Sequence, residues 1–179
     1  MQPIFFLAGP PAVGKSTTAH ALAGCFPKSV HIPVDDLRDM VVSGLRLPSA
    51  DWSPELVEQL ALARSSAAAM ARSYNAAGFA VAIDDFWDPN SRLAEYAALF
   101  RKPNTVKVLL LPSQATAAER ARERAGPGGD TSYLAGGIHL AYASLAGNAA
   151  LLSRRGWLVL DTSALDVQAT IQRILERAA

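Results

Sequence analysis

A motif of the form Gly-x-x-x-x-Gly-Lys-Ser lies close to the N-terminus of this chain of 179 residues and strongly limits the folds that the chain can adopt. The motif consists of Gly9, Pro10, Pro11, Ala12, Val13, Gly14, Lys15 and Ser16. Its glycines let the backbone turn tightly and bring main-chain amides close to a negative charge. The apolar run Ile4–Ala8 before it predicts a buried strand, and residues 16–24 predict a helix. Because a strand–motif–helix order is specific, the sequence predicts a loop that binds nucleotide phosphates.

Each polar residue of this phosphate-binding loop (the P-loop, residues 9–16) has an expected partner. Lys15 supplies a cation to the β- and γ-phosphates, and the Ser16 hydroxyl is a ligand for Mg²⁺. We expect the next residue, Thr17, to contact the nucleotide as well. The motif therefore indicates ATP or GTP, together with Mg²⁺. The alternative, a chance glycine-rich turn, is disfavoured because the whole motif and its context agree.

Apolar runs alternate with helical patterns along the rest of the chain. Further strands are predicted at 30–34, 79–83, 105–111 and 157–160. Helices are predicted at 37–43, 54–77, 91–100, 115–125, within 138–153 and at 167–177, with Ser53 capping the second of these. The strands are continuous apolar runs, as expected where helices cover both faces of a sheet. The sequence predicts a three-layer α/β fold with a parallel sheet of about five strands, in one domain over 1–179.

Composition narrows the range of partners. The formal net charge is +1, which argues against long nucleic acid as the main partner. A single cysteine, Cys25, excludes an intrachain disulfide and a cysteine-rich zinc site. No apolar run has the length of a membrane span or of a signal sequence, so we expect a cytoplasmic protein and no membrane partner.

Two acidic pairs follow predicted strands, at the edge where α/β sheets bind ligands. Asp84 and Asp85 end an apolar strand, where a carboxylate reaches the Mg²⁺ of a P-loop serine. Which of the two serves the metal stays open, and a helix cap or turn is the alternative role. Asp35 and Asp36 end the second strand, and Arg38 lies three residues after Asp35. These residue types suit a base for an acceptor hydroxyl and an anion-binding arginine, against the alternative of a helix cap and a solvated arginine.

Arginines and a hydroxyl pair complete the set of candidates. Arg120 and Arg124 share one face of a predicted helix, and residues 126–129 after it are rich in glycine. We expect a mobile lid at about 120–137 that brings an arginine to the transferring phosphate, the alternative being a solvated helix. Thr162 and Ser163, after the last strand, either contact the adenine side of the nucleotide or cap the final helix. His31 is expected to pack within its strand.

Taken in order, these motifs resemble the small P-loop kinases. The chain is similar to chloramphenicol phosphotransferase, zeta-toxin-like kinases and the 5′-kinase domain of phage polynucleotide kinase. The resemblance implies that Asp35 is the general base and that Arg38 binds the acceptor or a phosphate. It also implies that Arg120 and Arg124 are lid arginines and that residues 161–163 form the adenine-side loop.

The sequence therefore predicts a kinase that moves the γ-phosphate of ATP onto a hydroxyl of a small molecule, such as an antibiotic-like or sugar-like compound. Two alternatives stay open: a kinase of nucleotides or nucleic-acid 5′ ends, and a regulatory P-loop NTPase without an acceptor. The acceptor itself is not encoded in any motif, and neither is the oligomeric state.

Overall fold

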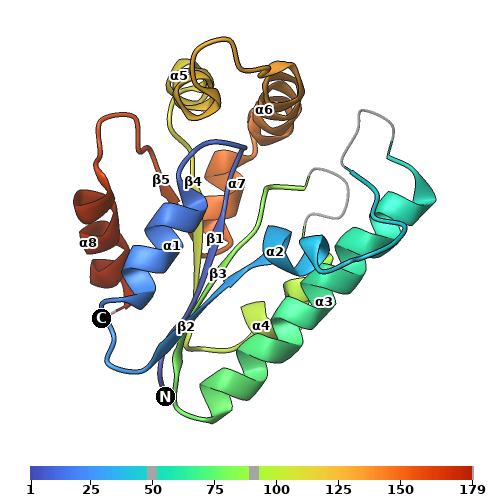
Figure 1. Cartoon of the computed structure of the whole chain (residues 1–179). Helices are drawn as coiled ribbons and strands as arrows, with labels where there is room; N and C mark the ends of the chain where they lie inside the picture. The colour runs from blue at the N-terminus through green and yellow to red at the C-terminus, as the bar shows by residue number, and fades with distance from the viewer. Residues whose placement is uncertain (48–51, 89–92, 179) are drawn as a thin grey trace.

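The computed structural model describes residues 1–47, 52–88 and 93–178, which form one parallel sheet flanked by helices (Figure 1). The sheet has the strand order β2-β3-β1-β4-β5, and every neighbouring pair is parallel. Its strands are β1 Ile4–Ala8, β2 Ser29–Pro33, β3 Ala80–Asp84, β4 Thr105–Leu110 and β5 Trp157–Leu160. The predicted three-layer α/β fold with about five parallel strands is confirmed.

Helices cover both faces of this sheet. They are α1 Lys15–Ala23, α2 Val34–Asp39, α3 Pro54–Ala76, α4 Ala97–Phe100, α5 Gln114–Ala125, α6 Ser132–Leu145, α7 Ala149–Arg154 and α8 Val167–Ala178, with a 3-10 turn, η1, at Ala94–Tyr96. Figure 1 shows α1 and α8 on one side of the sheet, α3 and α4 on the other, and α5 and α6 above the end of β1. No helix formed by the described residues is long and apolar enough to cross a membrane.

The central strand β1 is buried on both faces, as its uninterrupted apolar sequence predicts. Phe5 and Leu7 pack into the core beneath α1 and α8, whereas Ile4 and Phe6 pack into the core beneath α3. Full burial of side chains of this size stabilises the fold by about 1.5–3 kcal/mol each. This strand therefore anchors the loop that follows it.

Hydroxyl caps begin two of the helices. Ser53 Oγ accepts a hydrogen bond from the amide of Leu56 at 3.2 Å, and Pro54 occupies the first turn of α3. Ser113 Oγ accepts from the amide of Thr116 at 3.1 Å at the start of α5. Each cap satisfies an amide that has no partner within its helix. The predicted cap at Ser53 is confirmed.

Two predicted helices were wrong in their bounds. The helix expected at 37–43 runs from Val34 to Asp39, because Val34 turns inward onto the core immediately after the extended Pro33. The helix expected within 138–153 is two helices, α6 and α7, separated where Gly147 adopts φ +74°. Part of the predicted lid is thus helical from residue 132 onward. The first residues of the helix expected at 91–100 lie outside the described residues, and the remainder is η1 and the short α4.

Candidate functional site

The P-loop connects β1 to α1 and depends on its two glycines. A Cβ atom at Gly9 would lie 2.4 Å from the carbonyl oxygen of Leu110, so no other residue fits there without a shift of the backbone. Gly14 caps α1 with φ +91°, a left-handed conformation that side chains disfavour. Ala12 also has a positive φ, +61°. The loop is therefore held in one shape, and the N-terminus of α1 behind it favours anions.

Lys15 lies over this loop. Its Nζ donates a hydrogen bond to the carbonyl oxygen of Pro10 at 2.9 Å. Burial lowers the pKa of the Lys15 amine, and the nearby carboxylates of Asp84, Asp35 and Asp85 oppose that shift. Carboxylates that follow both β2 and β3 thus raise the pKa of the P-loop lysine against the effect of burial. Thr17, exposed in the first turn of α1, completes the predicted loop residues.

Ser16 contacts Asp84, one of the two aspartates that the sequence offers as metal ligands. Ser16 Oγ donates to Asp84 Oδ1 at 2.7 Å, although 68 residues separate them in the chain. The other carboxylate oxygen, Oδ2, lies 2.6 Å from Nε2 of His31 on β2. The Asp84 side chain is only 7% exposed. Serine hydroxyl and carboxylate oxygens are the hard ligands that Mg²⁺ takes together with nucleotide phosphates, so these residues fit that ion.

Asp85 has a different environment from Asp84. Its Oδ2 atom pairs with Arg64 Nε at 2.8 Å and accepts a hydrogen bond from the hydroxyl of Tyr96 at 3.1 Å. Arg64 also pairs with Asp88, at 2.6 Å, and is 1% exposed. Burial raises the pKa of Asp85 to about 6, although the Arg64 guanidinium opposes the shift. The geometry thus brings Asp84, and not Asp85, into contact with the P-loop serine.

The second acidic pair lies in the first turn of α2. Asp35 is 75% exposed and lies 3.6 Å from Arg38 Nη1 through its Oδ1 atom. Arg38 is buried, and its Nη2 donates to the carbonyl oxygen of Arg46 at 3.0 Å. Its Nε has no hydrogen-bond partner among the described residues. Arg38 therefore joins α2 to the segment that leads into α3, and it leaves the Asp35 carboxylate open to solvent.

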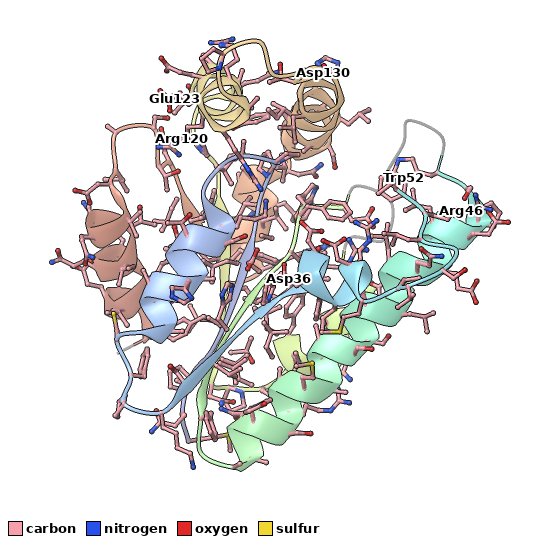
Figure 2. The ribbon with its side chains drawn as sticks, in the orientation of Figure 1. Asp36, Arg46, Trp52, Arg120, Glu123 and Asp130 are labelled. Carbon is pink, nitrogen blue, oxygen red and sulfur yellow. The ribbon has the colours of Figure 1, made fainter. Side chains whose placement is uncertain are left out.

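The lid arginines differ in their contacts. Figure 2 shows Arg120 on α5, above the end of the sheet, where its guanidinium donates to the carbonyl oxygens of Val13, at 3.4 Å, and Thr162, at 2.9 Å. Arg124, one turn further along α5, is exposed, and its charge also lowers the pKa of Lys15. Arg120 therefore ties α5 to the P-loop and to the segment after β5, whereas Arg124 is left to the solvent.

The segment after β5 is held by its own hydroxyls. Ser163 Oγ donates to Asp161 Oδ1 at 2.5 Å and accepts from the amide of Ser113 at 2.7 Å. The donation from Ser163 lowers the pKa of Asp161. Thr162 is buried, and its hydroxyl has no partner among the described residues. This loop thus lies beside Arg120 at the start of α5.

Sequence reasoning missed Arg64 and the pairing of His31 with Asp84. Arg64 occupies the apolar stripe of α3, in phase with the buried residues Leu60, Ala67 and Ala71, and that spacing would have indicated burial. His31 was expected to pack in its strand. Its pairing with Asp84 depends on the register between β2 and β3, in which Pro33 lies opposite Asp84, and a single sequence does not reveal that register.

Comparison with known proteins agrees with this architecture. A family model described as AAA domain matches residues 4–145. A search of the curated proteins finds no match to this chain.

Solved structures resemble the fold over nearly the whole chain. The tunicamycin resistance protein of Deinococcus radiodurans has a TM-score of 0.69 and 16% identity, covering 100% of this chain and 96% of its own. A gluconokinase from Sinorhizobium meliloti has a TM-score of 0.64 and 16% identity, covering 98% and 91%. A shikimate kinase from Acinetobacter baumannii in complex with shikimate has a TM-score of 0.64 and 14% identity, covering 98% and 92%. At these identities the likeness concerns the fold.

Proposed function

This chain belongs to the AAA domain family, and we propose that it is a kinase that transfers the γ-phosphate of ATP to a hydroxyl group of a small molecule. The observation that carries the proposal is the meeting of three charges at one end of the sheet. Lys15 begins α1 beside Ser16, which contacts Asp84 at the end of β3 at 2.7 Å, and Asp35 lies in the first turn after the neighbouring strand β2. An NTPase without an acceptor has no need of the exposed carboxylate of Asp35 at that place.

The structural neighbours support the same class of reaction. Two of them are named as a gluconokinase and a shikimate kinase, so the fold carries kinases of small molecules. The present chain spans those proteins almost completely, which leaves room for the same arrangement of donor and acceptor. The nearly neutral charge of the chain favours a small acceptor over a polynucleotide.

In the proposed reaction, the acceptor oxygen forms a bond to the γ-phosphorus as the bond from that phosphorus to the β–γ bridging oxygen breaks, and ADP leaves. Asp35 accepts the proton of the acceptor hydroxyl, for which its 75% exposed carboxylate is accessible. Lys15 and the amides of residues 9–16 bind the phosphates. Arg38 orients Asp35 through their 3.6 Å contact and contributes positive charge at the acceptor side.

Ser16 and Asp84 would hold Mg²⁺, which when bound neutralises part of the negative charge of the phosphates. Arg120, whose guanidinium contacts the carbonyl oxygens of Val13 and Thr162, fixes the base of the lid beside the nucleotide. Arg124 is the lid arginine that we assign to the transferring phosphate, because it is exposed while its charge acts on Lys15. Thr162 and Ser163 would border the base of the nucleotide.

The test is the variant Asp35→Asn, assayed with ATP labelled in its γ-phosphate and a panel of antibiotics, sugars, nucleosides and oligonucleotides. Removal of a general base should lower kcat by about 10²–10⁴-fold and leave the affinity for ATP unchanged. Asp36→Asn is the matched control, since Asp36 is the adjacent exposed aspartate of α2 (Figure 2) and should keep full activity.

Full transfer by Asp35→Asn would contradict the assignment of the base. Binding of ATP by the wild-type protein without label on any member of the panel would favour the NTPase alternative. Label on oligonucleotide ends alone would favour the end-kinase alternative.

A further inference from the structure

A line of polar side chains runs beneath the P-loop on the face of the sheet that α1 covers. Ser16 and His20 are four residues apart on α1 and share one face of that helix. Opposite them, Asp84 ends β3 and His31 lies on β2. In the β2–β3 register His31 pairs with Ala82, so Asp84 is its diagonal neighbour on the same face of the sheet.

The two oxygens of the Asp84 carboxylate have separate partners in this line. Oδ1 accepts a hydrogen bond from the Ser16 hydroxyl at 2.7 Å, and Oδ2 lies 2.6 Å from Nε2 of His31. The side chains of His31 and Asp84 are 15% and 7% exposed. Nε2–H of the imidazole donates to the carboxylate, either in the corresponding neutral tautomer or in the protonated ring.

The imidazole of His31 is itself held in place. Its ring lies 5.7 Å from that of His20 in an edge-to-face arrangement at 68°. The strand fixes its backbone on one side, and α1 packs over it on the other. A donor that occupies one oxygen of a carboxylate leaves the other oxygen available to other groups. His31 occupies Oδ2, which leaves Oδ1 directed towards Ser16 and the P-loop.

We propose that His31 is a positioning residue for the magnesium site, which orients Asp84 so that its Oδ1 atom and the Ser16 hydroxyl serve the ion together. This inference rests on the proposed function, because the ion enters with the nucleotide. Hydrogen-bonding partners behind a metal ligand typically change metal affinity by about 10–100-fold when they are removed. A role confined to packing would instead change the stability of the fold and leave the requirement for Mg²⁺ as it is.

The experiment measures binding of a non-hydrolysable ATP analogue to the full chain at constant pH, first in a chelator and then over a range of Mg²⁺ concentrations. His31→Phe keeps a ring beside His20 and removes the donor. We expect its metal-free affinity to stay within about twofold of the wild type, while half-maximal enhancement of binding needs about 10–100-fold more Mg²⁺. His31→Gln, which retains an N–H donor, should recover most of the difference. His139→Ala, at an exposed histidine of α6, should bind like the wild type.

An unchanged Mg²⁺ requirement in His31→Phe would overturn the role of His31. Equal loss of affinity with and without Mg²⁺ would also overturn it, since the effect would then concern the shape of the loop. If His31→Phe fails to fold, as judged by its thermal transition, His31→Leu and His31→Gln provide the same comparison. His31→Leu lacks an N–H donor at this position, and His31→Gln retains one. A wild-type protein whose nucleotide binding ignores Mg²⁺ would contradict the proposed function, whereas transfer to an acceptor does not enter the measurement.

Discussion

Asp84 and Asp85 are neighbours in the chain and have the same side chain, but they lie in opposite layers of the molecule. Asp84 faces α1 and contacts Ser16 of the P-loop. Asp85 faces α3, where it is paired with Arg64 and accepts a hydrogen bond from Tyr96. The difference follows from the alternation of side chains along β3, where Ala82 packs beneath α1 whereas Val81 and Ile83 pack beneath α3.

This comparison separates a carboxylate available for ligand binding from one that belongs to the core. The charge of Asp85 is matched inside the protein by Arg64, which also pairs with Asp88. The charge of Asp84 has a hydroxyl and an imidazole as partners, and these leave it able to accept a cation. We therefore propose a ligand-binding role for Asp84 and a structural role for Asp85, and the substitutions below test that division.

The largest effect is expected on the free energy of unfolding, from a substitution in the buried network around Asp85. Arg64→Ala would leave the carboxylates of Asp85 and Asp88 buried without their guanidinium partner. Breaking a buried ion pair in this way costs about 3–5 kcal/mol, so the free energy of unfolding should fall by that amount. Urea unfolding measures it, and Arg72→Ala, at an exposed arginine of the same helix, should stay within about 0.5 kcal/mol of the wild type. Equal stability of both variants would contradict a structural role for the Arg64 network.

The next largest effect is expected on phosphate transfer, from a substitution of Asp84 beside the P-loop. Asp84→Asn keeps the shape of the side chain and removes its charge, so transfer should fall by about 100-fold, equivalent to about 2.7 kcal/mol in the activation barrier. Asp84→Asn should lower the free energy of unfolding by less than Asp85→Asn does, because Asp85→Asn removes one of the two carboxylates that pair with Arg64. Steady-state kinetics and urea unfolding of both variants give the comparison. The opposite result, in which Asp85→Asn loses Mg²⁺-dependent transfer and Asp84→Asn does not, would reverse our assignment of the two aspartates.

The smallest effect concerns the hydroxyl of Tyr96. Tyr96→Phe removes the 3.1 Å hydrogen bond to Asp85 Oδ2 and little else. A hydrogen bond to a charged group contributes about 1.5–3 kcal/mol, and we expect the lower end because Arg64 still holds that oxygen. The loss should appear in urea unfolding and not in the Mg²⁺ dependence of nucleotide binding. Tyr74→Phe, at an exposed tyrosine of α3, is the control and should be neutral. A shift in Mg²⁺ dependence in Tyr96→Phe would show that the two layers are coupled.

Much of the fold was predictable because its signals are local. The apolar runs of β1 and β5, the cap at Ser53 and the helix at 167–177 all follow from patterns within a dozen residues. The helices that were wrong in extent, α2 and α6, depend on what they pack against. α2 begins where Val34 enters the core, and α6 packs beside the P-loop, where a Cβ at Gly137 would lie 3.2 Å from Pro11 Cγ. No local pattern records such contacts.

The phosphate-binding loop and the α/β layering follow from the amino-acid sequence alone, because the glycine spacing and the apolar periodicity are properties of short segments. The sequence also identified two acidic strand ends as candidates. The contact of Ser16 with Asp84, the burial of Arg64 and the pairing of His31 with Asp84 became visible only in the three-dimensional arrangement. These outcomes depend on strand order and register. His31 and Asp84 are 53 positions apart in the chain, and Ser16 and Asp84 are 68 apart, yet each pair lies within hydrogen-bonding distance. Non-local pairing of this kind is decided by the packing of the whole sheet, and no single segment of the chain contains it.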